Sequence, residues 1–194
     1  MIAAATAAGK EVLRIYLDDN FEVEIKSDNS PLTIADKEAH RIIFQKLKSD
    51  LPTLPILSEE SENLTFEERK SWTSFFLVDP LDGTKEFINR NGEFTINIAL
   101  IHGTEPVAGV VYVPVNRKLY YGDTRSCSSF LESGGEKKRL TTRNLSTDLP
   151  IRIVASRRHG QKKLETVLKS ADELFASANV INMGSSIKLC LLAE

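Results

Sequence analysis

Cysteine, long apolar runs and surplus positive charge are all scarce in this chain, and each scarcity excludes a class of protein. The 194 residues include two cysteines, Cys127 and Cys190, which form no C-x-x-C pattern and are too few for a small disulfide-rich scaffold. We therefore expect two reduced, packed thiols in a reducing cytoplasm.

Long hydrophobic runs are missing as well. No stretch approaches the roughly 18 apolar residues that a membrane-spanning helix needs. The apolar N-terminus, residues 1–8, runs directly into Lys10 and Glu11 without a basic segment before it, which is unlike a signal peptide. We expect a cytoplasmic protein and leave peripheral membrane association open.

Charge of the two signs is nearly balanced. The chain has 25 Lys and Arg residues against 27 Asp and Glu residues, a formal net charge of −2, whereas nucleic-acid surfaces usually carry a clear basic excess. A nucleic-acid partner is therefore not expected. A small phosphate-bearing partner must be recognised at a local site.

The first part of the chain alternates helix and strand signals. Apolar residues at helical spacing over 4–16 predict a first helix that ends near residues 18–20. Alternation over 21–26 predicts a strand, and a second helix is expected from about Thr33, placed as its N-cap. A short buried strand is expected at 55–57.

A β-rich section follows. An apolar run over 74–78 predicts a central strand that stops at Asp79 and Pro80. Further strands are expected at 94–100, 107–113, 118–121 and 129–131, with hairpin turns at 102–105 and 134–135.

The composition turns polar over 141–150, so we place a domain boundary there. The prediction is an N-terminal α+β metal-binding domain, residues 1–148, and a partial C-terminal α/β substrate domain, residues 149–194. Because the final apolar helical pattern has no Gly, Asn or Pro to end it, we expect a C-terminally truncated chain.

The most informative segment is 79–84, D-P-L-D-G-T, because it comes directly after the apolar strand. Ligand sites in α/β proteins favour such strand ends. Pro80 fixes its φ and Gly83 permits a tight turn, so the carboxylates of Asp79 and Asp82 can converge to bind Mg²⁺. Asp-Pro and Asp-Gly are also common turn formers, so a turn without a site is the alternative.

Three further residues have both a functional and a structural interpretation. Glu59, in an S-E-E-S context, supplies a third carboxylate, and three adjacent acids would repel unless cations neutralise them; by itself it fits an exposed loop. Asp36, three residues after Thr33, fits a helix-capping role, and Thr84 fits an N-cap after the turn. Thr84 is expected to lead into a helix whose free N–H groups favour a phosphate.

Several motifs in the right order resemble the inositol monophosphatase superfamily. Residues 79–84 resemble its D-P-[IL]-D-G-T signature, and K-E-F at 85–87 resembles the bisphosphate nucleotidase branch. The segments 26–36, 155–159 and 184–188 match in order too. The likeness therefore covers nearly the whole chain.

The resemblance implies a fold and an activity. The fold is the layered α+β and α/β sandwich of the inositol monophosphatase and fructose-1,6-bisphosphatase type. The activity is the lithium-sensitive hydrolysis of adenosine 3′,5′-bisphosphate to AMP and phosphate, a reaction of sulfur metabolism, by water activated at two or three Mg²⁺ ions. A homodimer is left open.

The resemblance also implies site residues. The magnesium ligands would be Glu59, Asp79, Asp82 and the backbone carbonyl of Leu81. The residues that orient and deprotonate the attacking water would be Asp36 and Thr84. The substrate would be bound by Gly83, Thr84, His159, Gly184, Ser185, Ser186 and Lys188.

Two departures from the family pattern keep alternatives open. The pattern continues into a W-D-T-A-A type segment with a further metal-ligating Asp that does not occur here, and Arg158 stands where the nucleotidase branch commonly has Ser. The alternatives are inositol monophosphatase or fructose-1,6-bisphosphatase activity, a non-catalytic truncated binding protein, and a sheet protein with turn-forming acids and no site.

Overall fold

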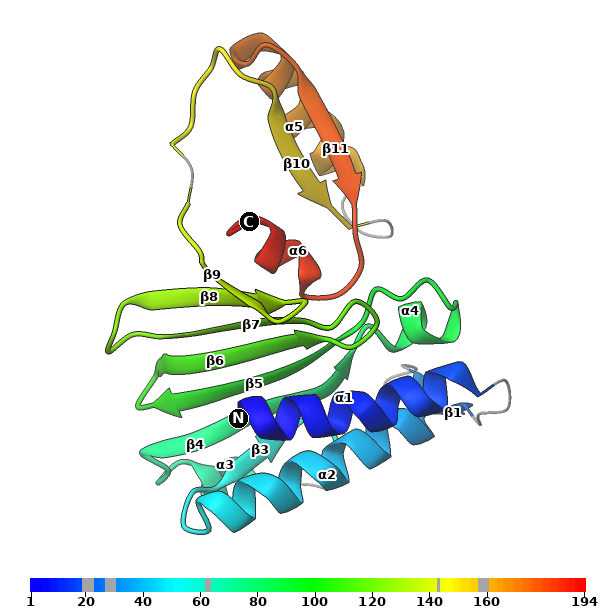
Figure 1. Ribbon diagram of the computed structural model, residues 1–194, viewed down its shortest axis with the longest axis vertical. Coiled ribbons are helices and arrows are strands. Elements are labelled where there is room, and N and C mark those ends of the chain that lie inside the picture. The colour runs from blue at the N-terminus through cyan, green and yellow to red at the C-terminus, as the bar shows by residue number, and fades with distance from the viewer. Residues whose placement is uncertain (19–22, 27–30, 62–63, 143, 157–160) are drawn as a thin grey trace.

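The computed structural model of the protein describes residues 1–18, 23–26, 31–61, 64–142, 144–156 and 161–194. Along the chain, two long helices precede a central β-rich section, and two further helices follow it (Figure 1). The described helices are α1 Ile2–Leu17, α2 Ile34–Asp50, α3 Phe66–Arg69, α4 Thr84–Ile88, α5 Gln161–Leu174 and α6 Ile187–Leu191.

The main sheet has seven strands in the order β3-β4-β5-β6-β7-β8-β9. They are β3 Ile56–Ser58, β4 Ser74–Asp82, β5 Thr95–His102, β6 Glu105–Val113, β7 Lys118–Asp123, β8 Ser128–Ser133 and β9 Glu136–Arg139. β3 pairs with β4 in parallel, and the remaining neighbours are antiparallel. Two small sheets add the antiparallel pair β1 Val23–Ile25 and β2 Pro31–Thr33 and the parallel pair β10 Ile151–Ala155 and β11 Ala178–Asn182.

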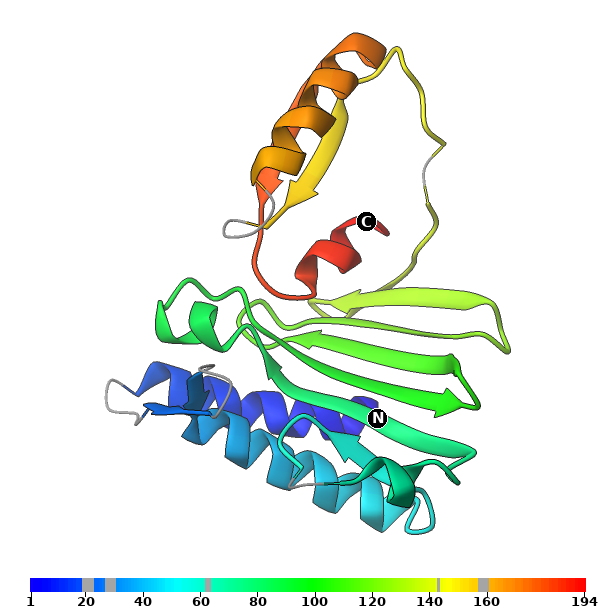
Figure 2. The same ribbon diagram turned by 180° about the vertical axis from the view of Figure 1, so that it is seen from behind.

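α1 and α2 lie side by side against one face of the main sheet (Figures 1 and 2). The buried stripe of α1 consists of small residues such as Ala5 and Ala8, which allow close approach to the sheet. A Cβ atom at Gly9 would lie 2.3 Å from a ring carbon of Tyr112, so the absence of a side chain there makes room for that ring. Phe76 and Ile98 complete this core from the sheet side.

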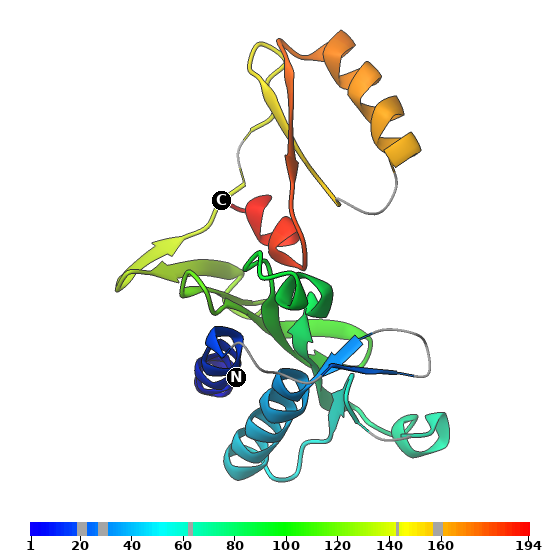
Figure 3. The same ribbon diagram turned by 90° about the vertical axis from the view of Figure 1, so that its right-hand side faces the viewer.

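A second, smaller core lies on the opposite face of the sheet. Ile187 and Cys190 of α6 pack there against Val113, Tyr120 and Leu140. Figure 3 shows α6 between the main sheet and the β10–β11 pair, with α5 on the outer side of that pair. The layers therefore run helix, sheet, helix, sheet, helix, which confirms the expected layered fold.

Most predicted elements are confirmed, including the second helix with Thr33 as its N-cap and the hairpin turns of the β-rich section. The strand signal at Phe21 lies outside the described residues. The domain boundary between residues 148 and 149 remains a prediction. Among the described residues, no helix combines the length and apolarity that crossing a bilayer requires.

Two sequence predictions are wrong. β4 does not stop at Asp79, because Asp79 still pairs with Asn97 and, after a shift of register, Asp82 pairs with Thr95. The two cysteines are free, as expected, but Cys127 is exposed in a turn, so Cys190 alone of the two is a packed thiol.

Candidate active site

The start of α2 brings Asp36 into the site and fixes its orientation. One carboxylate oxygen, Oδ2, accepts hydrogen bonds from the backbone N–H of Thr33 at 2.7 Å and from its hydroxyl at 2.6 Å. The other oxygen, Oδ1, accepts the hydroxyl of Thr84 at 3.1 Å. Asp36 is therefore both the N3 member of the capping box, with Thr33 as the N-cap, and a partner of Thr84, as the sequence interpretation allowed.

Burial raises the pKa of Asp36, although the hydrogen bonds from Thr33 act in the opposite direction. The side chain is 2% exposed, so its charge has little contact with water. A carboxylate with a raised pKa is a better proton acceptor than an ordinary aspartate.

The turn after β4 depends on Gly83, which adopts φ 95° and is the N-cap of α4. A Cβ atom there would lie 2.9 Å from the carbonyl oxygen of Glu93 and 3.2 Å from Cβ of Ser185. Thr84 is thus the first residue of the helix and not its N-cap, and its hydroxyl is 3.3 Å from the carbonyl oxygen of Leu81.

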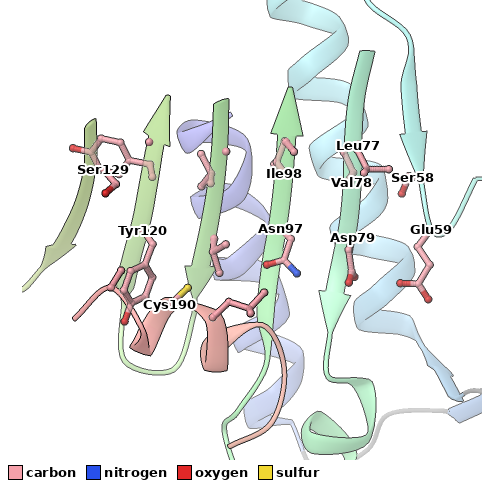
Figure 4. A pocket seen from close by; sticks show the side chains of 18 of the residues that line it. Ser58, Glu59, Leu77, Val78, Asp79, Asn97, Ile98, Tyr120, Ser129 and Cys190 are labelled. Carbon is pink, nitrogen blue, oxygen red and sulfur yellow. The ribbon is translucent and has the colours of Figure 1, made fainter. Parts of the chain in front are cut away.

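Three acidic residues, Glu59, Asp79 and Asp82, lie near one another at the ends of β3 and β4. Figure 4 shows Glu59, Asp79 and Asn97 at one level across neighbouring strands. Burial, followed by the negative charges of Asp82 and Glu59, raises the pKa of Asp79 to about 8. The site therefore holds more negative charge than its surroundings can stabilise.

Lys26 compensates part of this charge. Its Nζ atom is 2.9 Å from Glu59 and 2.6 Å from Glu60. Burial alone would lower the pKa of Lys26, but its hydrogen bonds with Glu60 and Glu59 outweigh that effect and raise it. The ammonium thus stays charged beside the acids.

Asp82 is held through one oxygen only, as far as the described residues show. Its Oδ2 atom accepts the hydroxyl of Ser185 at 2.7 Å and the backbone N–H of Ser186 at 2.5 Å. We call residues 184–186 the serine loop. It carries a further bond, because Nζ of Lys188 donates to the carbonyl of Ser185 at 2.6 Å.

The donor set fits a hard divalent cation. Glu59, Asp79 and Asp82 supply carboxylate oxygens, and an added cation would relieve the repulsion that raises the pKa of Asp79. Among the described residues, no three His, Cys, Asp and Glu side chains are grouped closely enough to hold a metal ion by themselves, so waters or substrate oxygens would have to complete the coordination. An open set of this kind suits Mg²⁺, which keeps several waters and shares substrate oxygens.

A pocket of about 480 Å³ lies between the β4–α4 turn and the serine loop. Its lining includes Asp82, Lys85, Glu86, Ser186 and Lys188, so two lysines and two acids contribute to this concave surface. An anion can be held there. A smaller pocket of about 190 Å³ lies on the other side of Lys85 and includes Glu59 and Thr84.

A larger apolar pocket, of about 750 Å³, adjoins the acids along the open face of the sheet. Asp79 and Asn97 lie at one end of it, and Tyr120 and Cys190 lie farther along the sheet (Figure 4).

The structure brings most predicted site residues together. Those around the β4–α4 turn and the serine loop are Asp36, Glu59, Asp79, Leu81, Asp82, Gly83, Thr84, Gly184, Ser185, Ser186 and Lys188. His159 lies outside the described residues. The metal and substrate roles of all these residues remain predictions.

Sequence reasoning missed Lys26, Thr95 and Asn97. Thr95 and Asn97 carry a signal, because they are polar residues that alternate with buried apolar residues along β5 and so share the opposite face. Lys26 carries no such sequence signal, because a lysine in a polar segment is most simply interpreted as a solvated side chain.

A family model described as "Inositol monophosphatase family" matches residues 1–194. The 3′(2′),5′-bisphosphate nucleotidase CysQ of Salmonella typhimurium is 41% identical over 191 residues, which is 98% of this chain and 74% of that protein. The protein of the same name from Escherichia coli strain K12 is 40% identical with the same coverage.

Solved structures of inositol monophosphatase family proteins are also similar to this chain. The crystal structure of CysQ from Bacteroides thetaiotaomicron, described as a bacterial member of the inositol monophosphatase family, has a TM-score of 0.82 and 39% identity. It covers 100% of this chain, which spans 74% of that structure. The extragenic suppressor protein suhB from Bartonella henselae has a TM-score of 0.76 and 27% identity, with 99% of this chain and 72% of that one covered.

Proposed function

The chain belongs to the inositol monophosphatase family, and we propose that it is a Mg²⁺-dependent 3′(2′),5′-bisphosphate nucleotidase. It hydrolyses adenosine 3′,5′-bisphosphate and water to AMP and inorganic phosphate. The observation that carries the chemistry is the buried Asp36–Thr84 pair beside the three acids, in a chain about 40% identical to nucleotidases over nearly its whole length.

Two or three Mg²⁺ ions would be held by Glu59, Asp79, Asp82 and the carbonyl of Leu81. When bound, they supply a more acidic water and neutralise charge on the phosphate. A staphylococcal inositol monophosphatase forms an inhibitory complex with LiCl, so we expect lithium sensitivity here. The number of Mg²⁺ ions is part of the proposal.

Asp36 and Thr84 handle the proton of the attacking water. The Thr84 hydroxyl donates to Oδ1 of Asp36, so its oxygen retains the capacity to accept a hydrogen bond from the attacking water. Because burial raises the pKa of Asp36, its carboxylate accepts a proton more readily than a solvated aspartate. The pair orients the water and takes up its proton.

Substrate binding involves the β4–α4 turn and the serine loop. Gly83 allows the turn to pack closely against Glu93 and Ser185, and Lys188 and Lys85 line the adjoining pocket. The nucleotide and its second phosphate occupy that pocket, with His159 as a further contact. We also propose a cytoplasmic location and leave a homodimer open.

Phosphate release from adenosine 3′,5′-bisphosphate, inositol 1-phosphate and fructose 1,6-bisphosphate tests the function, with and without Mg²⁺ and Li⁺. Preference for the bisphosphonucleoside, dependence on Mg²⁺ and inhibition by Li⁺ are expected. Preference for either sugar phosphate would replace the substrate assignment, and no turnover with any of them would contradict the activity.

Asp36→Asn tests the proton acceptor. We expect kcat to fall about 10²- to 10⁴-fold, because the amide accepts no proton while Mg²⁺ binding persists. Asp50→Asn, at the exposed end of the same helix, is the matched control and should leave kcat unchanged. Full activity of Asp36→Asn would exclude the proposed role.

A further inference from the structure

Three alternate residues, Glu93 just before β5 and Thr95 and Asn97 within it, form a row that contacts the serine loop. Thr95 and Asn97 share one face of the strand, because residues two apart in an extended chain point the same way. Oε2 of Glu93 accepts the N–H of Gly184 at 2.6 Å, and Oδ1 of Asn97 accepts the hydroxyl of Ser186 at 3.0 Å. The two ends of the row thus hold the two ends of the serine loop, and Thr95 lies between them.

Thr95 is fully buried and meets every group at the centre of this contact. Its Oγ1 atom is 2.7 Å from Oγ of Ser185, 2.8 Å from Oγ of Ser186 and 3.4 Å from Oδ2 of Asp82. It is also the strand partner of Asp82. One hydroxyl therefore joins the loop to the predicted metal ligand.

Counting the hydroxyl hydrogens shows what Thr95 contributes. The hydrogen of Ser185 is directed to Asp82 and that of Ser186 to Asn97. Each hydroxyl has one hydrogen to donate. With the serine hydrogens so directed, the single hydrogen of Thr95 can bridge to Oγ of Ser185, to Oγ of Ser186 or to Oδ2 of Asp82, one of these contacts at a time.

The serine loop also needs such support. Ser185 adopts φ 56°, in the left-handed region that is costly for a residue with a side chain. Such a conformation persists where the surroundings determine it, and Asp82 and Thr95 are its hydrogen-bonded surroundings.

We propose that Thr95 is a positioning residue, whose buried hydroxyl fixes the serine loop against Asp82. It thereby sets the affinity for Mg²⁺ and, through the loop, for the phosphate ester. The substrate part of this inference rests on the proposed function. Thr95 itself touches neither the cation nor the reacting atoms.

The test compares Thr95→Val with Thr95→Ser by calorimetric titration of the full chain with Mg²⁺ alone. Thr95→Val keeps the shape and removes the hydroxyl, so the Mg²⁺ dissociation constant should rise on the order of tenfold, the usual effect of losing a supporting contact behind a metal ligand. Thr95→Ser retains the hydroxyl and should restore most of the affinity. Thr124→Val, at an exposed hydroxyl bonded to the carbonyl of Val107, is the matched control and should bind Mg²⁺ normally.

A double variant separates positioning from general loss of structure. If Thr95 acts through Ser185, then Thr95→Val combined with Ser185→Ala should bind Mg²⁺ about as weakly as the weaker single variant. Fully additive losses would overturn the inference, as would Mg²⁺ affinity in Thr95→Val equal to that of the unmodified chain, or no Mg²⁺ binding by the unmodified chain.

Kinetics distinguish this inference from the proposed function. For adenosine 3′,5′-bisphosphate, Thr95→Val should raise KM about tenfold with a smaller effect on kcat. An unmodified chain that binds Mg²⁺ but hydrolyses no phosphate ester would refute the activity and leave the positioning role supported by the titration. An active chain in which Thr95→Val changes neither Mg²⁺ affinity nor KM would refute the positioning role alone.

Discussion

At the scale of single residues, the site depends on carboxylates that are held in place by hydrogen bonds to their own oxygens. Asp36 uses one oxygen for the helix start and the other for Thr84. Asp82 likewise has Oδ2 bonded to the serine loop. A carboxylate fixed in this way, fully buried at Asp36 and half-buried at Asp82, is held in place by its hydrogen bonds, so the geometry exists before any ligand arrives.

Asp79 gives the clearest prediction on pH. Its pKa is raised to about 8 in the folded chain, above its ordinary value of 3.8, so the metal-free protein loses stability as pH rises from about 4 through 8. Asp79→Asn removes this loss. Thermal unfolding with a chelator present should therefore show Asp79→Asn about 1–3 kcal/mol more stable than the unmodified chain at pH 8.5, and less than half of that difference at pH 5.

Saturating Mg²⁺ should make the unmodified chain more stable than Asp79→Asn at pH 8.5. A bound ligand stabilises the folded chain, and Asp79→Asn should bind Mg²⁺ more weakly. The unmodified chain should gain thermal stability on addition of Mg²⁺, and Asp79→Asn should gain less. Metal-free stability in the unmodified chain that is the same at pH 5 and pH 8.5 would contradict the assignment.

At the scale of elements, the β4–α4 turn connects the acids to the rest of the site, and Gly83 is its constrained point. Gly83→Ala must place a side chain at φ 95° and 2.9 Å from the carbonyl of Glu93. The expected loss is about 2 kcal/mol of unfolding free energy, since the strained φ and the contact add. It is measured by urea unfolding.

Gly103→Ala is the matched comparison. Gly103 also has a positive φ, of 60°, but an added Cβ meets nothing within 4 Å. It should lose only about 1 kcal/mol. Equal losses in the two variants would show that the contact with Glu93 contributes nothing.

Sequence patterns predicted the elements well because these depend on nearby residues. Apolar spacing located α2 and its cap at Thr33, and alternation located β5. The extension of β4 through Asp82 was missed, since it depends on pairing with Thr95 across the sheet. The contact between β5 and the serine loop joins residues about 90 positions apart, and no local pattern encodes it.

At the scale of the whole molecule, α6 attaches the C-terminal segment to the main sheet. Ile187 is 8% exposed in the second core, whereas Leu189 of the same helix is 70% exposed. Ile187→Ala should cost about 2–4 kcal/mol of unfolding free energy in urea titration, through lost burial and a cavity. Leu189→Ala should change it by less than about 0.5 kcal/mol. A small effect of Ile187→Ala would indicate that α6 is held by the hydrogen bonds of the serine loop alone.

The shared use of Asp36 has one more consequence. Its proton-accepting oxygen is placed only when the first turn of α2 has formed and the turn carrying Thr84, 48 residues later, has docked beside it. Recovery of catalysis after dilution from denaturant therefore reports the last of these two events, whereas far-UV circular dichroism reports the formation of secondary structure throughout the chain. A lag between the two signals would time the assembly of the site during refolding.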